Sequence, residues 1–333
     1  MSGNGPLLSV RDLSVSFPAE QGQLCVVSDV CFDVGIGRTV VLVGESGCGK
    51  TVTALSILRL IAEPGRIEKG RILFRGGDLL GLSEKQMRCV RGGDIAMIFQ
   101  EPVTSLNPVY TVGGQIVEAL EAHQEVKGEQ ARERAVQMLR EVGIRDARQC
   151  ARRYPHQLSG GMQQRVMIAM ALSCKPSLLI ADEPTTALDV TTQARILDLL
   201  RGLQRQSDMS ILFITHDLSV ASQIADDVVV MYASKVVEAG SVDEVFAAPL
   251  HPYTKGLLRL MEKRKSKNGY LEVVEGLMPD ASHFPSGCRF HPRCATGAGD
   301  KRCQEKEPGL KEVMRGGCAA CWHVQGYKNT MVM

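Results

Sequence analysis

The stretch GESGCGKT, residues 44–51, decides how the chain folds. It fits the pattern G-x-x-x-x-G-K-[ST] of a loop that binds phosphate groups through backbone N–H donors. An apolar run, RTVVLVG, leads into it, and KTVTALSILRLI follows with apolar residues at helical spacing. A phosphate loop requires this order of strand, glycine turn and helix. We therefore expect Lys50 to reach the β- and γ-phosphates of a nucleotide, and Thr51 to hold Mg²⁺.

The rest of the chain predicts an α/β fold. Buried-strand patterns at 94–99, 177–182, 210–217 and 227–232 alternate with helical stretches, which is typical of a largely parallel sheet. The alternating runs LLSVRDLSVSF and QLCVVSDVCFDV near the start predict antiparallel strands. A polar, helix-rich insertion predicts a helical subdomain at about 103–170 of a nucleotide-binding domain. The composition changes much later, and we place the end of this domain near Pro249. We place that domain at 1–248 and a cysteine-rich extension at 249–333.

The composition and net charge disfavour a nucleic-acid-binding, a secreted or a membrane-spanning protein. The 333 residues carry a net charge of +2, and no basic stripe with aromatics predicts a nucleic-acid partner. The start shows no basic segment followed by an apolar core, so we expect no secretory signal. No apolar run approaches the roughly 18 residues of a membrane-spanning helix. Eleven cysteines in such a chain indicate reduced thiols, some of them metal ligands.

Two further motifs predict functional groups. SLLIADEP ends an apolar strand in two acids, of which Asp182 is placed to hold Mg²⁺ and Glu183 to orient or deprotonate an attacking water. LSGGM begins a helix with Ser159, Gly160 and Gly161, which predicts a second anion site. A single ATP cannot easily use both anion sites. Two chains that face each other could.

The order GESGCGKT, FQ, LSGGM, LLIADEP, TALD, THD resembles the nucleotide-binding subunit of ATP-binding cassette (ABC) transporters, over about residues 7–240. The resemblance implies that Phe17 stacks on adenine and that His216 clamps the γ-phosphate. It also implies that Gln100 senses Mg²⁺ and the attacking water, that residues 159–161 bind the opposite subunit's ATP, and that Asp189 sits at the dimer seam. As alternatives, Gln100 could cap a strand end and His216 could be a core histidine. The positions expected to bind ATP and Mg²⁺ are Phe17, Gly44, Ser46, Gly47, Cys48, Gly49, Lys50, Thr51, Val52, Gln100, Ser159, Gly160, Gly161, Asp182 and Asp189, with Glu183, His216 and Gln100 catalytic.

Further stretches, IAMIFQEPVTSLNPVYTVGGQI and HPYTKGLLRL at 251–260, resemble the dipeptide, oligopeptide and nickel importers of bacteria. This resemblance implies two permease subunits, a substrate-binding protein and a second, homologous ATPase, with a heterodimer favoured over a homodimer. It places the chain on the cytoplasmic face of the bacterial membrane. Peptide is the favoured cargo. Nickel, glutathione or antimicrobial peptides are alternatives, and a soluble ATPase acting on ribosomes or DNA is an alternative of another class.

Five cysteines are concentrated in the extension. By resemblance to the same importers, Cys288, Cys294, Cys303 and Cys321 are predicted to hold a [4Fe–4S] cluster. Zinc is the alternative, because Cys318 and Cys321 have the C-x₂-C spacing that zinc favours, and simple burial is another. In the iron–sulfur case Cys318 is not needed as a ligand, although it could replace Cys321. We expect the cluster to be structural, although a redox-sensing role stays open.

A sixth cysteine, Cys48, lies inside the phosphate loop between Gly47 and Gly49. Its closeness to Lys50 and to a helix N-terminus predicts a lowered thiol pKa and a reactive thiol. The alternative is a small residue that only fills space.

Overall fold

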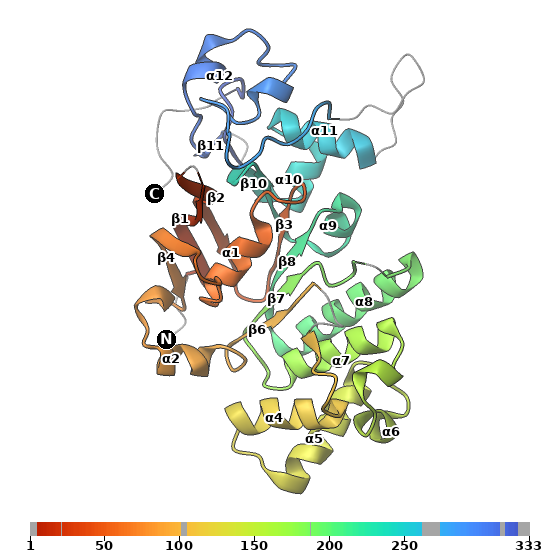
Figure 1. Cartoon of the computed structure of the whole chain (residues 1–333). Coiled ribbons are helices and arrows are strands. Elements are labelled where there is room, and N and C mark those ends of the chain that lie inside the picture. Colours follow the sequence, from red (N-terminus) through yellow and green to blue (C-terminus); the bar gives the residue numbers. More distant parts are fainter. Residues whose placement is uncertain are drawn as a thin grey trace. The chain divides into compact units, whose positions relative to one another are not determined.

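The computed structural model describes residues 5–20, 22–100, 105–186, 188–261, 274–313 and 317–325 (Figure 1). It consists of two compact units. The first unit comprises Met1–Leu80 and Thr215–Met333, and the second comprises Gly81–Ile214. The predicted domain boundary at 248/249 does not coincide with a boundary of these units, because the described C-terminal residues belong to the first.

The first unit contains the antiparallel sheet that the N-terminal alternation predicts. Its strands lie in the order β2-β1-β4-β5, with bounds β1 Leu8–Ala19, β2 Gly22–Val34, β4 Arg66–Phe74 and β5 Gly77–Asp78. Along β1 the apolar residues at 8, 10, 13 and 15 are fully buried, so one face of the hairpin belongs to the core.

The same unit holds the strand that leads into the phosphate loop. Thr39–Val43 forms β3, in which all five residues are buried. It pairs in parallel with β9, Asp227–Tyr232, from Val40 opposite Asp227 to Val43 opposite Val230. Both strands are rich in valine, as expected for parallel strands that are covered on both faces. The helices of this unit are α1 Lys50–Ile57, α9 Leu218–Ile224, α10 Val242–Ala247, α11 Pro252–Met261 and α12 Lys301–Glu305.

The C-terminal segment, by which we mean residues 274–313 and 317–325, is blue in Figure 1 and extends the sheet of the first unit. Lys235–Ser241 forms β10, antiparallel to β9, and Cys318–Ala319 forms β12 beside it. Lys311–Glu312 forms β11 at the edge. Phe290, before the 3₁₀ turn His291–Arg293, is buried against the rings of Tyr232 and Tyr253, with centroids 5.1 and 5.6 Å away. The segment therefore shares the core of the first unit.

The second unit combines three parallel strands with the predicted helical insertion. Strand β7 lies between β6 and β8. Helices α4 and α5 contact each other, and both contact α6 and α7. On α5, Ala131, Ala135, Met138 and Leu139 form the buried face, as its apolar spacing predicts. Residues 103 and 104 of the predicted subdomain lie outside the described residues. The bounds are α2 Glu84–Val90, β6 Ile95–Ile98, α4 Val112–His123, α5 Gly128–Glu141, α6 Ala147–Ala151, α7 Gly160–Leu172, β7 Leu178–Asp182, α8 Val190–Ser207 and β8 Ser210–Thr215.

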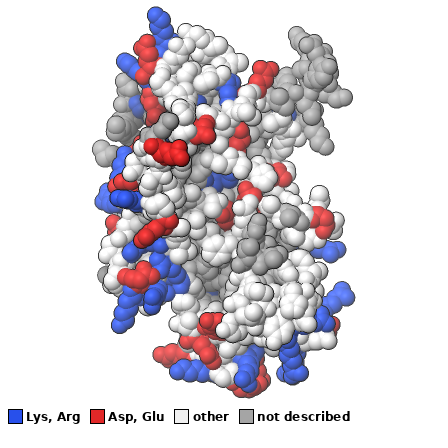
Figure 2. All heavy atoms as spheres, viewed as in Figure 1, with Lys and Arg blue, Asp and Glu red and all other residues white. Residues whose placement is uncertain are grey.

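Two further properties concern the helices and the surface charge. Within the described ranges, none of the helices has the length and hydropathy needed to cross a bilayer. On the face drawn in Figure 2, both acidic and basic side chains are distributed around the surface.

One histidine is enclosed in the first unit. His251 is 1% exposed, and its Nδ1 accepts a hydrogen bond from the N–H of Tyr253 at 3.1 Å. Its own backbone N–H donates to Oε2 of Glu238 at 2.8 Å. Burial lowers the pKa of the His251 ring to about 3. The ring is therefore neutral in the folded protein at neutral pH.

This buried ring should make stability depend on pH. The ring's ordinary pKa is 6.5, so between that value and about 3 the unfolded chain binds a proton that the fold excludes, and stability falls as pH falls. At pH 5 the loss should be about 2 kcal/mol. His251→Asn keeps an acceptor for the Tyr253 N–H and cannot titrate. The free energy of unfolding of this variant, measured in urea, should therefore change less between pH 7 and pH 5 than that of the wild type. An equal change in both proteins would show that His251 is not the source of the pH dependence.

Candidate functional site

The phosphate loop passes so close to neighbouring backbone that two of its glycines have no room for a side chain. A Cβ at Gly44 would lie 2.2 Å from the carbonyl oxygen of Met231, and one at Gly49 would lie 2.4 Å from that of Val26. Gly49 also has a φ of 102° and is the N-cap residue of α1. Glycine is the residue that adopts this conformation without strain. The loop is thus held between β2 and β9.

Lys50 begins α1 and is turned into the loop. Its side chain is 5% exposed, and Nζ donates to the carbonyl oxygens of Gly44 at 2.8 Å and Glu45 at 3.0 Å. A buried ammonium group surrounded by carbonyl dipoles forms a cationic centre inside the loop. Ser46, Gly47 and Thr51 are exposed around it, and Val52 is half-buried. This is the arrangement that anionic phosphate groups require.

The structure contradicts the prediction of a reactive thiol at Cys48. The residue is completely buried, and its Sγ lies 2.8 Å from the position of a Cβ on Gly44. Burial raises the pKa of the Cys48 thiol, although Lys50, with Nζ 3.9 Å from the sulfur, acts in the opposite direction. Desolvation outweighs the charge, so Cys48 fills space in the loop.

In the second unit, the structure brings Glu183 and Gln100 together. Asp182, at the end of β7, is 1% exposed, and Glu183 follows it with a φ of 45°. The Glu183 carboxylate oxygen Oε2 accepts from Nε2 of Gln100 at 3.2 Å and from Oγ1 of Thr186 at 2.9 Å. Its backbone N–H donates to the Ile214 carbonyl at 2.9 Å. Left-handed backbone at a residue other than glycine is uncommon and is concentrated at functional sites. The sequence analysis did not single out Thr186.

The remaining site residues end or begin elements. In the second unit, Ser159 precedes α7, and among the described residues its hydroxyl caps no N–H of that helix. Asp189 is exposed and caps α8, accepting from the N–H of Thr192 at 3.0 Å and from its Oγ1 at 2.7 Å. In the first unit, Phe17 lies half-buried near the end of β1, and His216 is exposed after β8. The phosphate loop, Phe17 and His216 thus belong to the first unit, and the other site residues belong to the second.

Four of the five C-terminal cysteines form a cluster. Electrostatic interactions join Cys288 to the other three thiols, Cys303 to Cys294 and Cys321, and Cys321 to Cys294. Burial, together with the neighbouring thiols, raises the pKa of the Cys288 thiol to about 11. For Cys318, burial and the charge of Glu312 raise the thiol pKa. We call Cys288, Cys294, Cys303 and Cys321 the cysteine cluster; their role as metal ligands stays a prediction.

Comparison with known proteins identifies the family. A family model described as ABC transporter matches residues 27–186, and one described as Oligopeptide/dipeptide transporter, C-terminal region, matches residues 237–308. A putative peptide import ATP-binding protein of Brucella melitensis is 50% identical over 320 residues, covering 92% of this chain and 94% of the relative. The chain belongs to the ABC transporter family.

Other ABC proteins support the same grouping. The dipeptide transport ATP-binding protein DppD of Bacillus subtilis is 50% identical over 86% of both chains, and DppD of Escherichia coli is 46% identical over 95% of this chain and 96% of the relative. A dimeric ATP-binding cassette, MJ0796, solved with ADP and phosphate, has a TM-score of 0.64 at 25% identity. It covers 71% of this chain and 98% of its own. The fold is thus that of an ABC ATPase with an added C-terminal segment.

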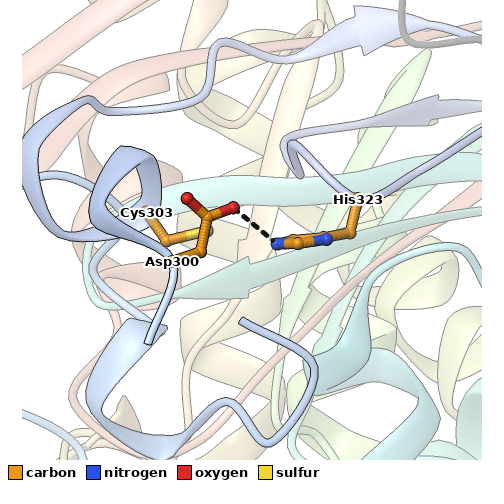
Figure 3. Close-up of side chains that lie close together, drawn as sticks. All are labelled: Asp300, Cys303 and His323. Carbon is orange, nitrogen blue, oxygen red and sulfur yellow. Dashed lines mark ion pairs between the residues drawn. The ribbon is translucent and has the colours of Figure 1, made fainter. Parts of the chain in front are cut away.

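One more group of possible ligands lies beside the cysteine cluster of this ABC protein (Figure 3). The ligand atoms of Asp300, Cys303 and His323 lie within 4.8 Å of one another. Oδ2 of Asp300 is 3.0 Å from Nε2 of His323, and Asp300 also caps α12. The Asp300–His323 pair therefore links the segment that carries Cys303 to the segment that carries Cys321.

The burial of Cys48 predicts the outcome of thiol labelling. A maleimide applied to the native protein should modify the exposed Cys89 and leave Cys48 unmodified, because a buried, protonated thiol is a poor nucleophile. Cys48 should become modified only after denaturation. Peptide mass spectrometry measures both sites in one sample. Labelling of Cys48 at the rate of Cys89 in the native protein would show that the loop is open.

Proposed function

We propose that this chain is the ATPase subunit of a membrane transporter that imports dipeptides or oligopeptides. The observation that carries the proposal is the contact between Gln100 and Glu183 beside the buried Asp182, on a chain whose other unit has Lys50 inside a phosphate loop. The relatives named as peptide or dipeptide transport ATP-binding proteins, which match over most of their lengths, support the choice of cargo.

The chemistry follows from the residues of each unit. Lys50 would exchange its two carbonyl partners for phosphate oxygens, so the ammonium group stays paired when ATP binds. Thr51 and Asp182 are oxygen ligands of the kind Mg²⁺ prefers, and the ion would offset the charge of the phosphates. Glu183 would orient the attacking water or take its proton, with Gln100 and Thr186 fixing the carboxylate. His216 and Phe17 would contact the γ-phosphate and the adenine.

The proposal includes partners. Ser159 and the exposed start of α7 would bind the ATP of a second, homologous ATPase, and Asp189 would lie at the seam between the two subunits. In the second unit, Phe99, Val109 and Tyr110 are 41%, 71% and 57% exposed, and such apolar side chains suit contact with a permease subunit. Two permeases and a substrate-binding protein would complete the importer. The chain would then work on the cytoplasmic face of the bacterial membrane.

Glu183→Gln tests the catalytic assignment. In the assembled transporter, the variant should bind ATP normally but lose both ATP hydrolysis and peptide uptake by a factor of about 10² or more, because an amide cannot take the proton of the attacking water. Glu141→Gln, an exposed change on α5, is the control and should leave both rates unchanged. Hydrolysis near the wild-type rate in Glu183→Gln would remove Glu183 from the mechanism. If the transporter used ATP to take up nickel but not peptide, the proposal that its cargo is a peptide would be wrong.

We further propose that the four clustered cysteines hold a [4Fe–4S] cluster. Zinc would hold four sulfurs about 3.8 Å apart, since zinc–sulfur bonds are about 2.3 Å and tetrahedral. Among the described residues, no three of these sulfurs lie within 4.8 Å of one another. Four thiols that interact, with no three of them so close together, suit the corners of a larger cluster.

Gly297 adds to the fit. A Cβ there would lie 3.2 Å from Sγ of Cys303 and 3.6 Å from Sγ of Cys294, so glycine leaves room between two of the sulfurs. Its N–H donates to the Cys294 sulfur at 3.3 Å, and such bonds stabilise thiolate ligands. In the proposed role the cluster is structural and holds together a segment with few large apolar residues.

Metal analysis distinguishes the alternatives. Protein purified without oxygen should be brown, contain about four irons per chain and lose its colour with dithionite. Cys303→Ser should lower the iron content, whereas the matched change Cys318→Ser should leave it unchanged, because Cys318 is not among the four proposed ligands. A colourless protein with one zinc and no iron, prepared from iron-replete cells, would contradict this assignment and leave the ATPase assignment intact.

A further inference from the structure

The C-terminal segment of the first unit makes direct contact with the phosphate loop. Arg293 directly precedes Cys294, and its side chain is 7% exposed. Its Nη1 lies 3.1 Å from Oε1 and 3.2 Å from Oε2 of Glu45, the second residue of the loop. A residue near the end of the chain is thus ion-paired with a residue that lies 248 positions earlier.

The other nitrogens of the Arg293 guanidinium group bind a second stretch of the backbone, at residues 274 and 275. Nε donates to the carbonyl oxygen of Glu275 at 2.9 Å, and Nη2 donates to that of Val274 at 3.1 Å. A few residues later, Cε of Met278 lies 3.3 Å from where a Cβ on Gly47 would be. Arg293 therefore contacts the phosphate loop at Glu45 and also anchors the segment that lies against Gly47. Only arginine has a planar fork of donors that can serve a carboxylate and two carbonyls together.

Aromatic residues fix both partners of this ion pair. The backbone N–H of Glu45 donates to the hydroxyl of Tyr253 at 3.1 Å, and Tyr253 is fully buried. The hydroxyl of Tyr232 lies 3.4 Å from Nη1 of Arg293, and the ring lies 5.6 Å from the guanidinium carbon. Phe290, three residues before Arg293, packs on both tyrosines. Neither end of the ion pair can move without disturbing this core.

We propose that Arg293 is a positioning residue for nucleotide binding. It holds Glu45 directly and Gly47 through residues 274–278, so that the loop keeps the shape that receives phosphate groups. The C-terminal segment thereby sets the affinity of the phosphate loop for ATP. The inference rests on the proposed function only in taking residues 44–51 as the ATP site, and it does not depend on the metal.

The test measures binding of a non-hydrolysable ATP analogue with Mg²⁺ to the full-length chain. Arg293→Gln should raise the Kd about tenfold, the lower end of what a charged hydrogen bond contributes. Arg293→Lys keeps a positive charge opposite Glu45 but lacks the planar set of guanidinium donors. The Kd of this variant should therefore lie between those of Arg293→Gln and the wild type. In the assembled transporter, Arg293→Gln should raise KM for ATP and leave kcat within about twofold, because the reacting groups are untouched.

Two further variants keep the test decisive. Glu45→Gln changes the loop and leaves the C-terminal segment intact; it should weaken binding as Arg293→Gln does, and the double variant should be no weaker than either. Arg289→Gln is the matched control, because Arg289 also adjoins a clustered cysteine but donates to the Ala233 carbonyl at 2.6 Å and to Oγ of Ser28 at 3.3 Å.

Three outcomes would count against the assignments. Wild-type affinity in both Arg293→Gln and Glu45→Gln would overturn the inference, and so would an equal loss in Arg289→Gln. A wild-type chain that fails to bind the analogue would instead overturn the ATP site on which the proposed function depends.

Discussion

The backbone of residues 44–51 passes through a gap that admits no side chain at two points. The carbonyl of Met231 on β9 lies against Gly44, and that of Val26 on β2 lies against Gly49, each so close that a methyl group on the glycine would overlap it. The loop is therefore fixed by the two strands beside it, and Lys50 is turned inward onto the loop's own carbonyls. Because that ammonium group is nearly buried, the site offers an incoming phosphate a charge already placed and largely desolvated.

This constraint gives the C-terminal segment a role beyond extending the sheet. The rings of Tyr232, Tyr253 and Phe290 pack together, and the first of these follows Met231 on β9. Tyr253 binds the backbone of Glu45, and Arg293 binds its carboxylate. The segment that carries the cysteines and the loop that carries Lys50 are therefore parts of one packed core. A cluster at the cysteines would stabilise the same core.

The sequence predicted the elements with strong local patterns, including β3, α1, the parallel strands and the helical insertion. It did not reveal β4, nor the two-residue strands β11 and β12, which form because β10 offers an open edge. Among the site residues, local context misled at Cys48, where the helix end and Lys50 are evident in the sequence but burial is not. The contact of Arg293 with Glu45 leaves no local signal, because it depends on how residues 248 positions apart pack. The cysteine set could be chosen over Cys318 only by resemblance, because sequence spacing alone fits either Cys318 or Cys321 as the fourth ligand.

The most direct test of this account is a crystal structure of the chain with Mg²⁺ and a non-hydrolysable ATP analogue. The account predicts that the phosphates lie within residues 44–51, with Nζ of Lys50 moved from the carbonyls of Gly44 and Glu45 to phosphate oxygens. Glu45 should keep its contacts with Tyr253 and Arg293. Phosphates bound elsewhere would contradict the account, as would a loop that must release Glu45 from Arg293 before it accepts them.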